Sequence, residues 1–279
     1  MKLIQNGRFD KERAFYGEEN IRIVASKIDG EADGESAFKE CKNIEAEGCY
    51  FNLRYPFWHT HGIKISDCEM TPLCRAALWY SSDISVNDSK LLGIKALREC
   101  KGVRIENSEI SSAEFGWFSS GVEIINSRAE SDYFMLRARG LRFENSRLDG
   151  KYSFQYAEDV VIDNCVLNTK DSLWHAKRCT VRNSIVSGEY LGWYSEDVTF
   201  ENCIIKGTQP LCYAKGLRLR NCEMHEADLA FEKSSLEADI TTNILSIKNP
   251  ESGYIIAPSI SEIISDYPTD CKVWLAKDV

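Results

Sequence analysis

The stretch "VTFENCIIKGTQPLCYAKGLRLRNCEM", residues 198–224, decides the fold. It contains the phrase "VTFENC" and, nineteen residues later, the phrase "LRLRNC". Each phrase alternates apolar and polar residues and ends on Asn and Cys. Self-similarity at a fixed interval is typical of repeat proteins, in which each repeat is one structural unit. The same phrase is therefore expected along the rest of the chain.

The phrase does recur, and its last residue is always small. Successive copies lie nineteen residues apart, except for one interval of twenty-one residues between Cys68 and Ser89. The clear copies end at Cys49, Cys68, Ser89, Ser108, Ser127, Ser146, Cys165, Ser184, Cys203 and Cys222. Weaker copies, "IRIVAS" at 21–26 and "LEADIT" at 236–241, bring the total to about twelve repeats.

The columns of one repeat are numbered from the first apolar residue of the phrase, so that Val198 occupies column one. Columns one and three are apolar, whereas columns two and four are mostly charged or polar, which predicts a half-buried strand. Column five is Asn or Asp in most copies, and Asn tolerates the left-handed backbone of a tight bend. Column eight is mostly apolar again, which predicts a second short strand after the bend.

A nineteen-residue repeat is too short for a βαβ unit, which takes about 30 residues or more. The sequence therefore predicts an all-β protein: a single-stranded parallel β-helix of about 12 coils, right-handed by analogy with other β-helices that carry stacked asparagines. Hydrogen-bonded Asn side chains in column five would then form a ladder. We expect one domain over 1–279, with regular coils at 44–241, an N-terminal cap and first coil at 1–43, and a C-terminal cap at 242–279.

The amino-acid composition excludes some classes of binding partner. The chain has 34 Lys and Arg against 43 Asp and Glu, a formal charge of −9, which argues against nucleic acid and anionic membrane surfaces. No apolar run approaches the length of about 20 residues that spans a bilayer, and no secretory signal is recognisable. We therefore expect a cytoplasmic location, with the eleven cysteines reduced.

Several longer phrases resemble a known family. They include "RAALWYSSDISV", "KYSFQYAEDVVI", "TKDSLWHAKR", "GEYLGWYSEDVTFENC" and "SIKNPESGYIIA". Together they are similar to the bacterial domain-of-unknown-function family 3737 over nearly the whole chain. The resemblance implies a pectin-lyase-like β-helix, in agreement with the columns, and it implies no assigned activity and no catalytic residues.

Five of the six tryptophans share column fifteen, and aromatic and polar residues fill column sixteen beside it. An outward strip of this kind could bind a sugar, because flat rings stack on sugar faces and polar groups bind hydroxyls. The alternative is that the indoles point inward and fill the core. The candidate ligand-binding residues are Trp174, Trp193, Tyr194, Tyr156, Arg137, Tyr213 and Gln209.

Asp171 and Glu189 occupy neighbouring columns of successive coils, so their carboxylates are expected about 5–8 Å apart. That range overlaps the separations of glycosidase carboxylate pairs. With His175 nearby, these three residues are the candidate catalytic group. The alternative is a solvated corner in a chain rich in acids. The four histidines form no metal-binding pattern, and no metal or cofactor is expected.

The leading hypothesis is a non-catalytic β-helix that presents a side wall to a carbohydrate-like or protein ligand. The first rival is a polysaccharide- or oligosaccharide-active enzyme, a hydrolase or lyase, centred on Asp171 and Glu189. The second rival is a protein-interaction scaffold or homo-oligomer that buries the aromatic strip against a partner.

Overall fold

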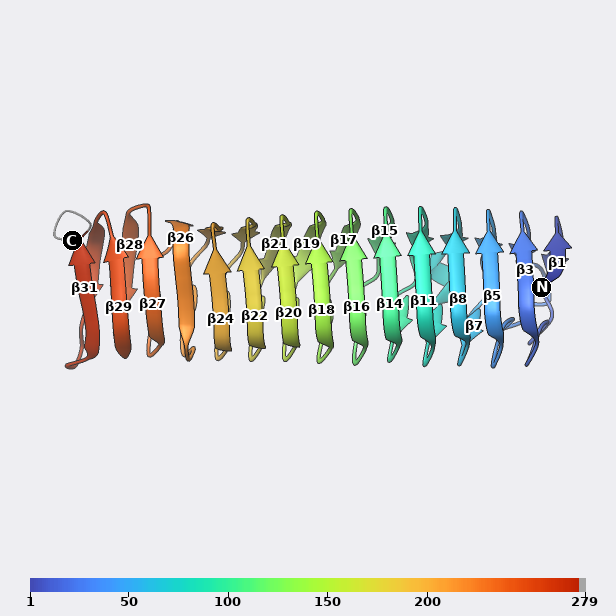
Figure 1. Cartoon of the computed structure of the whole chain (residues 1–279), viewed down its shortest axis with the longest axis horizontal. Helices are drawn as coiled ribbons and strands as arrows, with labels where there is room; N and C mark the ends of the chain where they lie inside the picture. Colours follow the sequence, from blue (N-terminus) through green and yellow to red (C-terminus); the bar gives the residue numbers. More distant parts are fainter. Residues whose placement is uncertain (276–279) are drawn as a thin grey trace. The chain divides into compact units, whose positions relative to one another are not determined.

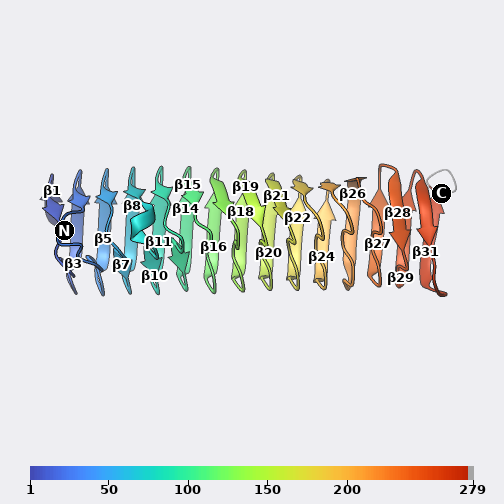
Figure 2. The same ribbon diagram turned by 180° about the vertical axis from the view of Figure 1, so that it is seen from behind.

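The computed structural model describes residues 1–275 and consists almost entirely of parallel strands stacked as a β-solenoid of about 14 turns. The residues group into two compact units, Met1–Ser146 and Arg147–Val279. Within each unit the strands lie side by side in chain order, as Figures 1 and 2 show from opposite sides. The predicted all-β parallel β-helix with a repeat of about nineteen residues is therefore confirmed. The single-domain organisation stays a prediction.

The first unit contains three walls, one for each straight segment of a coil. The first wall consists of β1 (Lys2–Gln5), β3 (Glu19–Val24), β5 (Lys42–Glu47), β8 (His61–Ser66), β11 (Ser82–Asn87), β14 (Lys101–Glu106), β16 (Ser120–Ile125) and β18 (Arg139–Glu144). The second consists of β2 (Arg8–Phe9), β4 (Lys27–Ile28), β6 (Tyr50–Phe51), β9 (Glu69–Met70), β12 (Lys90–Leu91), β15 (Glu109–Ser111) and β17 (Arg128–Ser131). The third consists of β7 (Phe57–Trp58), β10 (Leu78–Trp79) and β13 (Leu97–Arg98). One short 3₁₀ helix, η1 (Pro72–Cys74), lies in the coil that is two residues longer than the others.

The second unit repeats the first two walls. Its first wall consists of β20 (Glu158–Asp163), β22 (Lys177–Arg182), β24 (Glu196–Glu201), β26 (Leu217–His225), β27 (Ser235–Ile240), β29 (Ser252–Ala257) and β31 (Asp270–Leu275). Its second wall consists of β19 (Arg147–Lys151), β21 (Val166–Lys170), β23 (Ile185–Ser187), β25 (Ile204–Lys206) and the end of β26, which pairs with β25. The strand β28 (Ile244–Lys248) pairs with β30 (Ile260–Ile264).

The coil count is about 14 rather than the predicted 12, because the segments expected to cap the ends also form strands. At the start of the chain, Lys2 pairs with Ile21 and Arg8 pairs with Lys27, each at the nineteen-residue offset of the regular coils. At the other end, β29 pairs with β27 and with β31. The first copy, "KLIQNG", begins with Lys in place of an apolar residue, and the C-terminal copies are offset by 17 and 18 residues, which made them hard to recognise in the sequence.

Column five turns the corner after each strand of the first wall. Its Asn and Asp residues have φ between +47° and +53°, the left-handed conformation that these residue types adopt most readily. Asn221 donates its side-chain amide to Asn202, at 2.8 Å, and Asn202 donates to Asn183, at 3.3 Å. Asn183 donates instead to Asp163 of the preceding strand. A ladder along the whole column stays a prediction.

Column six has a role beyond filling a narrow interior. In the first unit the backbone N–H of Ser89 donates to the hydroxyl of Ser108, at 3.1 Å, and Ser108 N–H donates to Ser127, at 3.0 Å. The Ser108 hydroxyl donates in turn to the Glu106 carbonyl, at 2.6 Å. Because these groups are buried, each hydroxyl satisfies an amide that would otherwise be unpaired. This explains why the column accepts only small residues that can accept a hydrogen bond.

All eleven cysteines lie within the described residues and are free, and ten of them are buried. Burial raises the pKa of Cys74 and of Cys100 to about 12, so that both are neutral thiols at physiological pH. They pack as small apolar residues, as expected from the sequence. Within residues 1–275 there is no helix long and apolar enough to cross a membrane.

The hydroxyl column makes a first prediction. Ser108→Ala removes the acceptor for the buried Ser89 N–H and should lower the free energy of unfolding by about 1–3 kcal/mol. Ser108→Cys should lose less, because Cys68 Sγ accepts the Cys49 N–H, at 3.3 Å, in the same column. Urea unfolding of the three proteins measures the difference. An alanine variant as stable as the wild type would contradict the assigned role.

Candidate functional site

Four side chains of column sixteen form a continuous stack in the second unit: Tyr156, His175, Tyr194 and Tyr213. Their ring centroids are 4.7, 5.0 and 5.0 Å apart, with planes within 14° of parallel. All four residues have φ between +54° and +59°, so this column forms another corner of the coil. Tyr156 and Tyr194 are 41% and 42% exposed. These four residues are called the aromatic stack.

Trp174 and Trp193 lie beside the aromatic stack and stack on each other, with centroids 5.5 Å apart and planes 4° from parallel. Both indoles are half-buried, whereas Leu173 in the preceding column is fully buried. The indole N–H groups donate to the carbonyls of Tyr190 and Gln209, each at 2.7 Å. The tryptophans therefore pack against the backbone of the next coil's corner rather than fill the interior.

This packing limits what the aromatic side chains can bind. A sugar ring stacks on a free aromatic face, but each inner ring of the aromatic stack is covered on both faces by its neighbours at about 5 Å. Stacked aromatic pairs at such distances stabilise the fold by about 0.5–1.5 kcal/mol each. The edges of Tyr156 and Tyr194 remain exposed to solvent. A sugar-binding role for these residues stays a prediction.

Asp171 and Glu189 do lie on neighbouring coils, because the Asp171 N–H donates to the Glu189 carbonyl, at 2.8 Å. Asp171 is 8% exposed and sits at a corner with φ +52°. Burial raises its pKa above the usual range, the Glu189 charge adds to this rise, and Lys170 opposes it. Glu189 is exposed. His175 lies in the aromatic stack, between Tyr156 and Tyr194.

The remaining predicted residues are only partly gathered. Tyr213 belongs to the aromatic stack and donates its hydroxyl to Glu232, at 3.2 Å. Desolvation and the Glu232 carboxylate raise the pKa of Tyr213. Gln209 contributes its carbonyl to Trp193. Arg137 belongs to the first unit, whereas the other predicted residues belong to the second. No group of three or more potential metal ligands occurs within residues 1–275.

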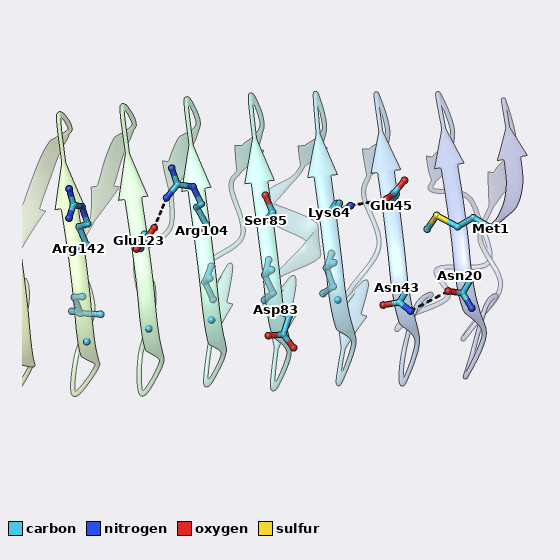
Figure 3. A pocket seen from close by; sticks show the side chains of 18 residues that line it. Met1, Asn20, Asn43, Glu45, Lys64, Asp83, Ser85, Arg104, Glu123 and Arg142 are labelled. Atoms are coloured by element: carbon cyan, nitrogen blue, oxygen red, sulfur yellow. Dashed lines mark hydrogen bonds and ion pairs between the residues drawn. The ribbon is translucent and has the colours of Figure 1, made fainter.

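The structure also contains a groove that the sequence analysis missed. It has a volume of about 850 Å³ and follows the outer face of the first wall in the first unit, from Met1 to Arg142. Figure 3 shows its labelled side chains in two rows. One row lies near the starts of the strands: Asn20, Asn43 and Asp83. The other lies further along them: Glu45, Lys64, Ser85, Arg104, Glu123 and Arg142.

The floor of the groove is made by column zero, the position directly before column one. Its seven residues have φ between +54° and +71° and are Asn20, Asn43, Gly62, Asp83, Gly102, Gly121 and Gly140. The pairing register passes over this column, since Lys101 pairs with Ser120 and Val103 with Val122. Column zero is the second residue of each of these strands, and its four glycines leave the floor without side chains at those positions. We call this feature the glycine groove.

In the second unit, column zero lacks consecutive glycines. There the same column holds Asp159, Arg178 and Asp197, and Arg178 donates to Asp159, at 2.7 Å. Paired side chains are therefore present at positions where Gly102, Gly121 and Gly140 of the first unit have none. A smaller groove of about 220 Å³ lies around Gly216, Ser235 and Gly253 in the second unit. The signal in the sequence was thus a glycine directly before the first apolar residue in "GIKI", "GVRI", "GVEI" and "GLRF".

The charged side chains along the glycine groove are paired. Lys64 forms an ion pair with Glu45, at 3.1 Å, and Arg104 with Glu123. Arg142 pairs with Glu144, outside the groove lining. The carboxylate of Asp83 accepts a hydrogen bond from the Ser82 hydroxyl, at 2.8 Å. Three basic and three acidic residues line the groove, so their formal charges cancel.

The raised pKa of Asp171 gives a second prediction. An acid with a raised folded-state pKa destabilises the native state once the pH exceeds its unfolded value, because ionisation then costs more in the folded chain. Asp171→Asn should therefore stabilise the protein at neutral pH, and the gain should shrink as the pH falls below about 4. Urea unfolding across this pH range measures it. A gain that is constant with pH would contradict the assigned desolvation.

Three solved structures that match this chain are distantly similar to it. A surface adhesin of Streptococcus pneumoniae, PfbA, is 13% identical, with 92% of this chain and 71% of that chain covered and a TM-score of 0.34. The catalytic domain of a GH87 α-1,3-glucanase, solved with tetrasaccharides, is 9% identical, with 99% and 62% covered and a TM-score of 0.26. The fluoroquinolone resistance protein QnrB1 is 16% identical, with 78% and 88% covered and a TM-score of 0.17.

No curated protein matches the chain. One family model does, the one described as protein of unknown function DUF3737, over residues 2–273. The match takes in nearly all of both compact units, so the resemblance inferred from the sequence is confirmed. The chain belongs to the DUF3737 family.

Proposed function

We propose that this chain is a non-catalytic recognition protein that binds an elongated, carbohydrate-like ligand in the glycine groove. The observation that carries the proposal is an open volume of about 850 Å³ that crosses consecutive strands of one wall. Pockets of several hundred Å³ with a few polar groups are typical of ligand sites. The binding surface is thus a side wall, as in the leading hypothesis, but a different wall from the aromatic one.

The direction of the groove favours an elongated ligand. Its floor residues come from seven successive coils, which at about 4.8 Å per strand spacing extend over about 29 Å. The ligand would cross the strands rather than lie along them. The strands from β3 to β16 are paired on both sides, and a peptide that adds to a sheet needs an unpaired edge. The charged and amide groups of the two rows suit hydroxyls instead.

The rival enzyme hypothesis is supported by one observation, the raised pKa of Asp171 beside Glu189. The pKa of a glycosidase general acid is also raised. Structural corners also bury acids, so the shift alone assigns no reaction. Hydrolysis or elimination of the bound oligosaccharide, lost in Asp171→Asn, would favour the enzyme over the recognition protein.

The state of the cysteines bears on the cellular compartment of the protein. Ten buried free thiols are suited to a reducing compartment, where they do not oxidise to mixed disulfides. We therefore propose a cytoplasmic protein.

A substitution on the groove floor tests the proposed function. Gly121→Asn puts a side chain into the groove at a column where Asn20 and Asn43 already adopt the same left-handed backbone, so the fold should be retained. On a glycan array, the wild type should bind at least one linear oligosaccharide, and Gly121→Asn should weaken that signal about tenfold or more.

Gly48→Asn is the matched control. Gly48 has φ +59° and lies in column five, where other coils carry Asn, and it does not line the groove. This control should bind as the wild type does. An array without any bound glycan, or equal signals from Gly121→Asn and the wild type, would overturn the proposal.

A further inference from the structure

We infer that the glycine groove selects an uncharged linear oligosaccharide over a polyanionic one. The inference rests on the proposed function and adds the chemical class of the ligand. The class follows from how the charges of the groove are arranged, from the chemistry of its floor and from the charge of the whole chain.

The ionisable groups of the groove already have partners. Glu45 and Lys64 pair across adjacent strands β5 and β8, and Arg104 and Glu123 pair across β14 and β16 (Figure 3). Their side chains are between 32% and 73% exposed, so each pair keeps contact with water and can still offer hydrogen bonds at its outer edge. An anionic ligand that approached one of these cations would also meet the carboxylate that already pairs with it.

The acids of the groove oppose an anion directly. Glu45, Asp83 and Glu123 line it together with three basic residues, so the site offers a polyanion no net attraction. The chain as a whole has a formal charge of −9, which adds a long-range repulsion at low ionic strength. Sites built for polyanions have an excess of Lys and Arg. The glycine groove does not.

An uncharged sugar chain fits the same groups without this cost. A carboxylate accepts hydrogen bonds from hydroxyls, and a guanidinium or an amide donates to them, so both kinds of side chain can be used in their paired state. The floor residues Gly102, Gly121 and Gly140 come from three adjacent strands and carry no side chains, which allows the ligand to approach the backbone closely. The ion pairs of the groove can thus form hydrogen bonds to a neutral ligand and orient it, because each charge is already balanced by its partner.

Isothermal titration calorimetry with three hexasaccharide probes tests the inference. Two probes are neutral, cellohexaose and maltohexaose, and the third, hexagalacturonate, is anionic. At least one neutral probe should bind, with an affinity that changes less than about twofold between low and high salt, and hexagalacturonate should bind about tenfold more weakly or not at all. Gly121→Asn should abolish the heat of the neutral probe, and Gly48→Asn should not.

The outcomes separate the inference from the proposed function. If hexagalacturonate binds more tightly than both neutral probes and the binding is lost in Gly121→Asn, the charge argument is overturned while recognition at the groove stands. If a neutral probe binds equally well to Gly121→Asn, the site lies elsewhere and both are overturned. If none of the three probes binds the wild type, the inferred ligand class is wrong. Circular dichroism of each variant verifies that it is folded.

Discussion

The structure depends on one constraint, that each coil must turn its corners with single residues in the left-handed conformation. Asn and Asp meet this demand in column five, and aromatic residues meet it in column sixteen. Gly, Asn or Asp in column zero adopts the same conformation within the strands of the first wall. Left-handed backbone costs most residues about 1–2 kcal/mol, so the surrounding stack must hold it in place. The stacked coils do so through parallel pairing, buried hydroxyls and packed rings. The same left-handed positions carry the two surface features of the protein, the aromatic stack and the glycine groove.

The columns that face the core could be predicted from the sequence because burial restricts which residue types can occupy them. Apolar columns one and three, the Asn corner and the small column six all recur often enough to reveal the period. The terminal coils and the groove were missed because their residue types are less restricted. Surface columns vary freely, and a glycine has no side chain that would contribute to a pattern of apolar and polar residues. The buried hydrogen bonds of column six also require the three-dimensional register, which a single sequence does not show.

The candidate residues illustrate a second limit. The sequence placed Trp174, Trp193 and the aromatic stack on one side of the coil, and the structure agrees that they lie together. What the sequence could not show is that the rings cover one another, since this depends on coil spacing and ring orientation. A repeat protein stacks identical columns at about 4.8 Å, which favours ring-on-ring packing. Hollow sites arise where the column loses its side chains, as at Gly102 and Gly121.

Amide hydrogen exchange, compared between the free protein and the protein saturated with a bound oligosaccharide, tests the central claim most directly. The account predicts slower exchange in the first unit, confined to the strands that hold Gly62, Gly102, Gly121 and Gly140, with no change across Tyr156 to Tyr213. Slower exchange at the aromatic stack, with the glycine groove unchanged, would contradict it.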